Sequence, residues 1–522
     1  MIAGRQLELY FPFEKVDVLR NADWAKFSVA LRGLFVFLGS PTLKFNWLLG
    51  LWVFAAVLIV RAPLVNAQER TEIVHPLIKE ALQTQTQPVD DSAKSVQTVE
   101  VFEYPGELES PLDNSEDRLG WFSNTRVGYD GGFIIANSRQ QELNSRDLPF
   151  CLQINGWGQL RHTIEFTDES GREDVNQFAL KRGRLIFQGS AYTPDFFYYI
   201  QLDGRSSSGD DVRLLDFYLS YDVGRHRWGL EKGVFGFRTG KYKMPFSLAR
   251  YLSGRELEFA DRSVASTFFD VNRSFAWGLY GSAGRQSLPV NWEVAIFNGL
   301  VTGGAETGSS GTLDNNFAYS ARVFSYPVGD WGVGELADFE GHCRPAVRTG
   351  MGFANSTIQK FGSTEFNAIR VVNTGRRLSE LLPTDVNEFT VNLVSVDASI
   401  KYRGWSATLE YYFRIISDFE GASIPDLYDH GFWLQAGKFI VPDHFQVLAR
   451  WSRVVGNSGT LGQNDLSSNE LAGGFSYYFR EQHAKLVFDC SYLDSAPIDS
   501  SSLGILPGDT GWLCRTQIQF SF

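Results

Sequence analysis

The sequence predicts an all-β protein: a transmembrane, antiparallel, up-and-down β-barrel of about sixteen strands. Segments of about ten residues alternate apolar and polar side chains with a period of two, and this is the length that a tilted strand needs to cross a bilayer. Short and long connections between these segments alternate almost strictly, as such a barrel requires. The chain also ends on an alternating segment that closes with an aromatic residue, Phe522.

The N-terminal part of the chain does not show this pattern. The apolar run 47–60 follows Lys44 and precedes the small-residue site 65–67, which is typical of a secretory signal. Residues 1–67 are therefore predicted to be an N-terminal extension and signal peptide, with an uncleaved anchor as the alternative. Residues 68–118 are rich in Gln, Thr, Ser and acidic residues and are predicted to form a largely disordered periplasmic linker.

The barrel is expected over 119–522. In its first strand Ile164 and Phe166 alternate with Thr163 and Glu165. The predicted strands are 152–166, 180–191, 195–205, 212–223, 233–243, 274–283, 289–299, 316–326, 346–355, 388–402, 405–415, 431–440, 445–454, 470–480, 483–493 and 513–522. The connection 327–345 is too long for a turn and is expected to hold an extra element.

Closure of the sheet leads to a functional expectation. Backbone polar groups in lipid must be paired within the protein, so a strand protein must close on itself. A closed sheet of about sixteen strands is wide enough to hold water. The sequence therefore predicts an outer-membrane porin for passive diffusion of small hydrophilic solutes. Two alternatives stay open: a non-conducting barrel that acts as an envelope anchor or adhesin, and a secreted carbohydrate-binding β-protein.

The polar faces of the predicted strands carry more bases than acids, although the formal net charge of the chain is −12. The basic candidates are Arg161, Arg182, Arg184, Arg205, Arg322, Arg348, Lys401, Arg414, Arg450, Arg480, Lys485 and Arg515. The acidic candidates are Glu165, Asp203, Asp216, Asp397, Glu410 and Asp489. Such a wall favours small anions such as phosphate. The alternative is that these arginines pair with the acids and stabilise the wall.

The connection after Lys243 is expected to narrow the barrel. Pro245 cannot donate to a sheet ladder, so the strand should end there. The following residues combine four arginines, four acidic residues and many aromatic and aliphatic side chains, a composition that argues against disorder. We predict that this third outer loop folds inward, with a surface loop packed on its own strands as the alternative.

Residues 240–247, G-K-Y-K-M-P-F-S, resemble a strand end of the phosphate-selective porin O and P family. The segments 258–262, 292–299 and 431–438 also resemble this family, and the resemblance spans roughly 120–522. It implies a homotrimer and selective bases near the constriction. The resulting candidates for the constriction and anion path are Lys241, Lys243, Arg250, Arg255, Arg262 and Arg273, together with Arg182 and Arg184 of the wall.

Two qualifications come from the sequence itself. Lys241 and Lys243 share the parity of the apolar Phe235 and Phe237, so without a bulge they are expected at the rim. The C-terminal aromatic resembles that of outer-membrane proteins in general, where this end is recognised by the outer-membrane assembly machinery.

Other classes of function find little support. The chain has 4 Cys without a C-x-x-C pair and 7 His without H-E-x-x-H, and it lacks a G-x-S-x-G motif. No enzyme activity, metal or cofactor is therefore predicted, and the acidic net charge argues against nucleic-acid binding. Cys490 and Cys514 fall near facing ends of the last two strands, where either a cross-strand bridge or two free thiols would fit.

Overall fold

The computed structural model describes residues 125–129, 131–137, 150–168, 173–205, 211–285, 288–302, 313–360, 364–372, 377–457, 461, 466–497, 508 and 510–522. The predicted signal segment 1–67 and linker 68–118 lie outside these residues. Within the described ranges, no helix has the length and apolarity to cross a membrane.

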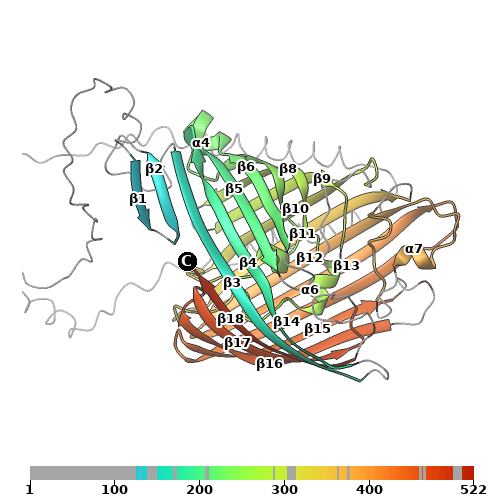
Figure 1. Cartoon of the computed structure of the whole chain (residues 1–522). Helices are drawn as coiled ribbons and strands as arrows, with labels where there is room; N and C mark the ends of the chain where they lie inside the picture. The colour runs from blue at the N-terminus through green and yellow to red at the C-terminus, as the bar shows by residue number, and fades with distance from the viewer. Residues whose placement is uncertain are drawn as a thin grey trace, which may run out of the picture. The chain divides into compact units, whose positions relative to one another are not determined.

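Sixteen antiparallel strands form a closed barrel (Figure 1). They are β3 (Phe150–Thr167), β4 (Val175–Ala191), β5 (Thr193–Arg205), β6 (Asp211–Tyr221), β7 (Phe235–Lys243), β8 (Arg273–Arg285), β9 (Leu288–Asn298), β10 (Phe317–Val328), β11 (Ala346–Gln359), β12 (Glu388–Tyr402), β13 (Trp405–Glu420), β14 (Leu427–Val441), β15 (Phe445–Gly456), β16 (Leu466–Arg480), β17 (Ala484–Asp494) and β18 (Gly511–Ser521).

Closure occurs between the last strand and the first strand of the barrel. β18 pairs with β3 in a continuous register from Gly511 opposite Thr167 to Ser521 opposite Trp157. Every other strand pairs with its neighbours in sequence. The predicted up-and-down topology and the number of barrel strands are confirmed, and most predicted strand ends lie within a few residues of the observed ones.

A short hairpin that the sequence analysis did not predict extends the wall. It consists of β1 (Thr125–Tyr129) and β2 (Phe133–Asn137). β2 pairs with residues 150–154 at the start of β3, and β18 pairs with the remainder of that strand. The hairpin therefore continues the sheet beyond the C-terminus, where the rings of Phe133 and Phe522 lie 6.4 Å apart.

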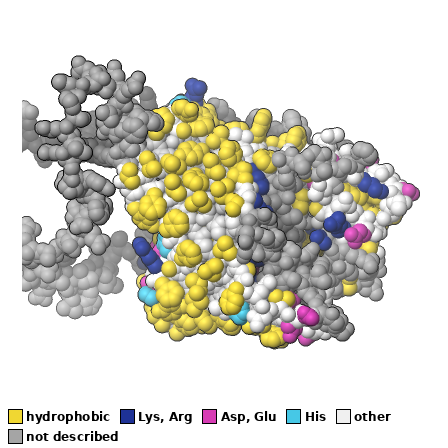
Figure 2. All heavy atoms as spheres, viewed as in Figure 1, with side chains coloured by type: hydrophobic (Ala, Val, Ile, Leu, Met, Phe, Trp, Pro, Cys, Tyr) yellow, Lys and Arg dark blue, Asp and Glu magenta, His cyan; other side chains and the backbone are white. Residues whose placement is uncertain are grey.

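Alternation along each strand separates an apolar outer face from an inner face that is mostly polar. On β13 the outward-facing Trp405 and Leu409 are 55% and 44% exposed, whereas the intervening Ser406 and Thr408 are 3% and 4% exposed. Figure 2 shows the outer face as a broad area of hydrophobic side chains. This surface suits contact with lipid chains, which cannot pair polar groups.

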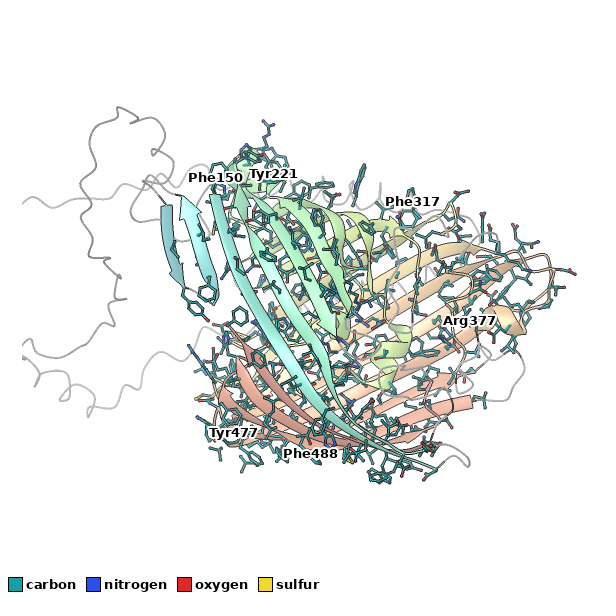
Figure 3. All side chains as sticks on the ribbon, in the orientation of Figure 1. Phe150, Tyr221, Phe317, Arg377, Tyr477 and Phe488 are labelled. Carbon is teal, nitrogen blue, oxygen red and sulfur yellow. A yellow bond between two sulfur atoms is a disulfide. The ribbon has the colours of Figure 1, made fainter. Side chains whose placement is uncertain are left out.

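The two ends of the barrel differ in their connections. At the end that we call the turn end, short connections such as 403–404 and 442–444 join the strands, and α4 (Val223–Trp228) covers one edge. The other end, the loop end, carries the long connections and α7 (Leu378–Leu381). In Figure 3, Phe150 and Tyr221 mark the turn end, and Arg377 marks the loop end.

The connection 329–345 lies at the turn end and folds onto the inner wall. It contains neither a helix nor a strand, so the extra element expected there is not formed. Instead the Phe339 ring packs 4.9 Å from that of Tyr478, and Lys401 Nζ donates to the carbonyls of Trp331 and Val333 at 3.0 and 3.1 Å. The buried base Lys401 is therefore held by backbone carbonyls of this connection.

The cysteines divide into one bridge and two free thiols. Cys490 of β17 and Cys514 of β18 lie directly opposite each other and form a disulfide. Cys151 is buried and Cys343 is exposed, and neither is bridged. The bridge ties together the last two strands, next to the seam where the barrel closes.

Candidate pore constriction

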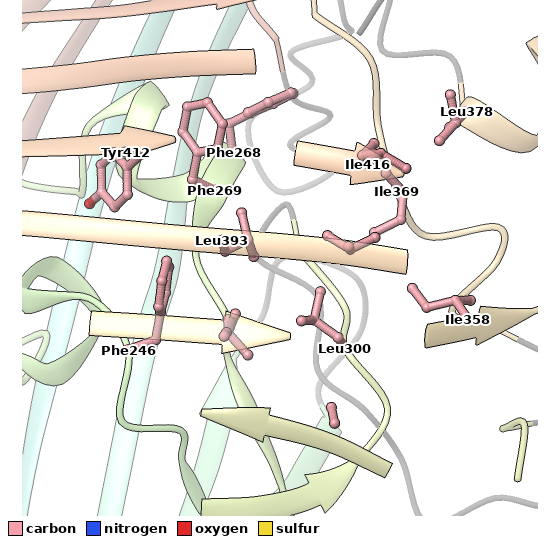
Figure 4. Packing of buried hydrophobic residues seen from close by; sticks show 14 of the residues in the cluster. Phe246, Phe268, Phe269, Leu300, Ile358, Ile369, Leu378, Leu393, Tyr412 and Ile416 are labelled. Carbon is pink, nitrogen blue, oxygen red and sulfur yellow. The ribbon is translucent and has the colours of Figure 1, made fainter. Parts of the chain in front are cut away.

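The connection between β7 and β8, residues 244–272, is called the constriction segment here. It contains α5 (Leu248–Tyr251) and α6 (Val264–Phe269), and the side chains of Ser247 and Ser263 cap these two short helices by accepting bonds from Arg250 N and Ser266 N. The segment packs apolar side chains against the inner wall, as Figure 4 shows for Phe246, Phe268 and Phe269 beside Leu393 and Tyr412.

Wall carboxylates accept bonds from the backbone of the constriction segment. Glu410 of β13 accepts from the N–H groups of Leu248 and Ala249 at 2.6 and 3.0 Å. Asp489 of β17 accepts from Ala260 N at 2.7 Å. These inward-facing carboxylates are fully buried. The segment therefore runs through the interior of the barrel and is attached to strands that are well separated in the sheet.

A carboxylate of the segment is attached to the wall in turn. Glu258 accepts from the amides of Gln435 and Gln446 at 2.6 and 2.5 Å and from the hydroxyl of Ser406 at 3.1 Å. Burial raises the pKa of Glu258, and the bonds from the two glutamines partly oppose this rise. A small, partly open pocket in the same region is lined by Glu258, Asp261 and Gln435 among others.

Asp261 of the segment meets three bases of the opposite wall. Its carboxylate lies 2.9 Å from Arg161, 2.9 Å from Arg182 and 3.5 Å from Lys181. Burial alone would raise the pKa of Asp261, but the charges of Arg182, Lys181 and Arg161 hold it well below its usual range. The single carboxylate of Asp261 therefore forms ion pairs with three basic side chains.

Lys181 faces inward beside Arg182 because β4 bulges at this point. Gln159 of β3 pairs with Arg182, and the next residue, Leu160, pairs with Leu180, which leaves Lys181 as the extra residue. Lys181 was not among the predicted lumenal bases, because strict alternation places it on the outer face. The basic run at 181–184 was the signal that could have identified it.

Eight basic residues gather where the constriction segment meets β4 and β6, and we call them the basic cluster. They are Arg161, Lys181, Arg182, Arg184, Lys243, Arg250, Arg262 and Arg273. The carboxylates that pair with them are Asp203, Asp216, Asp261 and Asp270. Arg184 lies 2.9 Å from Asp203, Arg273 lies 2.8 Å from Asp216, and Arg250 pairs with Asp270.

Two members of the cluster bind carbonyls rather than carboxylates. Arg262 donates to the carbonyls of Ala249 and Leu252, each at 2.8 Å. Lys243 donates to the carbonyls of Leu252 and Tyr251 at 2.8 and 3.2 Å. Within the described part of the chain, neither base forms an ion pair.

The positive charges within the basic cluster repel one another. Burial, followed by the positive charges of Arg250 and Arg182, holds the pKa of Arg262 well below its usual range, and Asp261 only partly opposes this. An anion that entered the cluster would relieve this repulsion. It could also accept charge-assisted hydrogen bonds from several guanidinium groups.

Comparison with known proteins identifies the class of membrane protein to which the barrel belongs. The sequence profile of the phosphate-selective porin O and P family matches residues 160–323, which include β5 to β9 and the whole constriction segment. The protein is an outer-membrane porin. Comparison with curated protein sequences gives no significant match.

Several solved structures are similar to this porin in fold. An anion-selective porin from Comamonas acidovorans is 9% identical, with a TM-score of 0.47 over 71% of this chain and 99% of that chain. The trimer form of in-vitro folded OmpT, an outer membrane protein of Vibrio cholerae, is 12% identical, with a TM-score of 0.43 over 71% and 99%. Salmonella typhi OmpF, in complex with daunomycin, is 12% identical, with a TM-score of 0.42 over 73% and 100%.

The porin brings together six of the predicted site residues. Arg182, Arg184, Lys243, Arg250, Arg262 and Arg273 all belong to the basic cluster. Arg255 does not, since it pairs with Glu256 at 3.2 Å and its carbonyl accepts from Lys485 of β17 at 2.9 Å. Arg205, a wall candidate, has no described side chain.

The placement of Lys241 in the anion path is corrected by the strand register. Lys241 lies directly opposite Phe217, whose side chain is 44% exposed on the lipid-facing surface. Its ammonium donates to the carbonyl of Leu214 at 3.2 Å in an exposed position. Period-two parity therefore puts Lys241 outside the lumen. Lys243 has the same parity, but it lies at the strand end, where its long side chain reaches the constriction segment.

Within the described ranges, no group of three or more His, Cys, Asp or Glu side chains is arranged to hold a metal ion.

Proposed function

We propose that this porin conducts small hydrophilic solutes passively and favours anions such as phosphate. The basic cluster carries the proposal, because its eight bases exceed its four carboxylates by four charges. In water a unit charge about 8 Å from an ion contributes roughly 0.5 kcal/mol, so a formal excess of four charges favours anions by up to about thirtyfold at low salt.

The arrangement of donors suits conduction rather than tight binding. An anion in transit exchanges part of its hydration shell for guanidinium and ammonium donors, and it must leave as easily as it enters. Arg262 and Lys243 are bound only to carbonyls, so they can turn toward a passing anion without breaking an ion pair. The constriction segment narrows the path and holds these donors near the wall.

Planar-bilayer recording tests the proposal. Purified protein should give stepwise conductance, and the reversal potential in a KCl gradient should indicate a preference for chloride. A preference for potassium would overturn the proposed selectivity. Silence over many insertions would instead favour the alternative of a non-conducting envelope anchor or adhesin. The apolar outer face of the closed barrel excludes the secreted soluble alternative.

The proposal includes further assignments that rest on sequence alone. We infer that residues 1–67 direct export and that residues 68–118 form a periplasmic linker. Assembly machinery of the outer membrane is proposed to recognise the end of β18, and a homotrimer is the proposed assembly. No catalytic step or cofactor is part of the function. His162, on the outer wall, lies 2.8 Å from the side-chain oxygen of Asn176.

A further inference from the structure

A patch of tyrosines lies on the inner face of the wall beside the basic cluster. Four consecutive strands, β5 to β8, each contribute one ring: Tyr199, Tyr218, Tyr242 and Tyr280. The rings of Tyr199 and Tyr218 stack at 5.1 Å with an interplanar angle of 17°, and those of Tyr218 and Tyr242 meet edge to face at 5.9 Å. These four residues are called the tyrosine patch.

Glycines on the neighbouring strands make room for the rings. A Cβ added at Gly278 would come within 2.4 Å of the Tyr242 hydroxyl, and one added at Gly236 would come within 2.3 Å of the Tyr280 ring. Any larger residue at these two positions would displace a ring. The positions of the Tyr242 and Tyr280 rings are therefore specified by the sequence of β7 and β8.

Arg238 and Glu293 supply polar groups to the patch. The Arg238 guanidinium carbon lies 5.2, 5.3 and 5.0 Å from the ring centroids of the three tyrosines on β6, β7 and β8. Its charge is balanced by Glu293 at 3.5 Å. Glu293 also accepts from the Tyr251 hydroxyl of the constriction segment at 2.7 Å. The patch thus combines aromatic faces with a neutralised ion pair.

The patch and the basic cluster follow each other along the wall. Tyr199 lies within electrostatic reach of Arg184 and Arg273. It stands four residues from Asp203 on β5, which corresponds to roughly 13 Å along a strand. The Tyr242 hydroxyl is buried and makes no hydrogen bond with the residues that the structure describes. The charges of Arg184 and Arg273 therefore act on Tyr199, so that the cationic site adjoins a surface of aromatic rings with hydroxyl groups.

We propose that the preferred solute class of this porin is phosphorylated monosaccharides, with the phosphate in the basic cluster and the sugar ring over the tyrosine patch. The inference rests on the proposed anion preference and adds the body of the solute to its charge. A sugar ring presents C–H groups to an aromatic face and hydroxyls to tyrosine, arginine and carboxylate groups at its edge. Inorganic phosphate would use the cluster alone.

Block of the ion current tests this assignment. Glucose 6-phosphate, inorganic phosphate and glucose are added separately to single wild-type channels in a bilayer at low salt. Glucose 6-phosphate should block at about tenfold lower concentration than inorganic phosphate, because ring stacking adds to the contacts of the phosphate. Glucose alone should block weakly.

Substitutions in the tyrosine patch test whether its rings cause the stronger block by glucose 6-phosphate. Replacing Tyr199 and Tyr218 together with alanine should weaken block by glucose 6-phosphate about tenfold and leave block by inorganic phosphate within about twofold of wild type. The Tyr199→Phe and Tyr218→Phe pair keeps the rings and should retain most of the block. Tyr411→Ala is the matched control, since Tyr411 is 42% exposed on the lipid-facing surface. This variant should change neither the block by glucose 6-phosphate nor the block by inorganic phosphate.

The outcomes separate this inference from the proposed function. Equal block by glucose 6-phosphate and inorganic phosphate would overturn the sugar assignment and leave anion preference intact. Equal block by glucose and glucose 6-phosphate would overturn the anionic class of solute. Absence of chloride preference in the reversal potential would remove the proposed function, and the inference with it.

Discussion

On β13 the inward-facing Glu410, Tyr412 and Arg414 are fully buried, whereas on β5 and β6 the inward-facing Tyr199 and Tyr218 remain half-exposed. The constriction segment and the connections of the loop end pack mainly on β12 to β15 and form an apolar core inside the barrel, which also reaches Tyr242 of β7 and Ala276 of β8. We call this the packed side, and we call the inner face of β4 to β8 the open side.

Charges behave differently on the two sides. On the packed side buried arginines have their own carboxylates, as Arg414 has Asp429 and Arg450 has Glu470. On the open side Arg184 and Arg273 also have carboxylates, but three bases share Asp261, and Lys243 and Arg262 bind carbonyls without an ion pair among the described residues. The packed side resembles the interior of a soluble protein and fixes the constriction segment. In the proposed function, the open side keeps an excess of bases over carboxylates along the path of the solutes.

The largest expected effect comes from breaking the attachment on the packed side. Glu410→Gln replaces a carboxylate that accepts from two backbone N–H groups with an amide whose NH₂ would face one of them. Loss of these charge-assisted bonds should cost on the order of 3 kcal/mol. The constriction segment should detach from β13, and single-channel conductance should rise clearly above that of wild type.

Glu388→Gln is the matched control, because Glu388 lies on the neighbouring β12 and its carboxylate accepts from the side-chain amide of Gln359 at 2.8 Å, not from the constriction segment as far as the structure describes it. Its conductance should equal that of wild type. Unchanged conductance of folded Glu410→Gln would mean that this attachment does not set the width of the path.

A smaller effect is expected from removing charge on the open side. Replacing Arg182 and Arg184 with alanine deletes two bases of the basic cluster. At roughly 0.5 kcal/mol for each charge, the preference for chloride over potassium should fall up to about fivefold at low salt. The reversal potential in a KCl gradient measures this change.

Arg348→Gln provides the comparison on β11, next to the packed side, because Arg348 is paired with Glu335 at 2.9 Å. The same recording should show a much smaller shift for this variant. If the double variant and Arg348→Gln shifted the reversal potential equally, the distinction between an open and a packed side would fail.

The local sequence pattern predicts the strands, but it does not predict which wall residues bind the constriction segment. Period-two alternation was sufficient for the sixteen barrel strands and for the outward parity of Lys241, since both depend only on neighbouring residues. It could not reveal the bulge at Lys181, which depends on the register with β3. The bonds from Glu410 and Asp489 to the constriction segment join residues more than 150 positions apart, and no local signal encodes them.

The hairpin β1–β2 was missed for a related reason. Its strands have only five residues each, too few to show a convincing alternation. The tyrosine patch was also hidden, because each strand contributes a single ring and the register alone brings them together.

A pH effect should appear on the packed side at the loop end. Burial, reinforced by the charge of Asp314, raises the pKa of Glu365 to about 7. The folded state therefore holds a proton that the unfolded state releases at lower pH, so the stability of this region is greatest in acid and falls as pH rises through 7. Hydrogen exchange of residues 364–372 should be faster at pH 8 than at pH 5, after correction for intrinsic rates.

Glu365→Gln should abolish this difference, since the amide cannot ionise. Equal protection of wild-type residues 364–372 at both pH values would contradict the assignment of a buried, protonated Glu365.

The smallest expected effect distinguishes two neighbouring lysines. Lys243→Ala removes a base that reaches the carbonyls of the constriction segment and should lower chloride preference about twofold. Lys241→Ala removes a base on the lipid-facing side and should leave the reversal potential unchanged. A larger effect from Lys241→Ala would contradict the register of β7.

Cysteine accessibility tests most directly that solutes follow the open side. In a background with Cys151 and Cys343 replaced by serine, cysteine is introduced at Tyr199 on β5 or at Leu393 on β12, and a negatively charged thiol reagent is added during recording. We predict that the current falls for Tyr199→Cys and stays constant for Leu393→Cys, which is fully buried under the constriction segment. A fall for Leu393→Cys with no change for Tyr199→Cys would contradict the account.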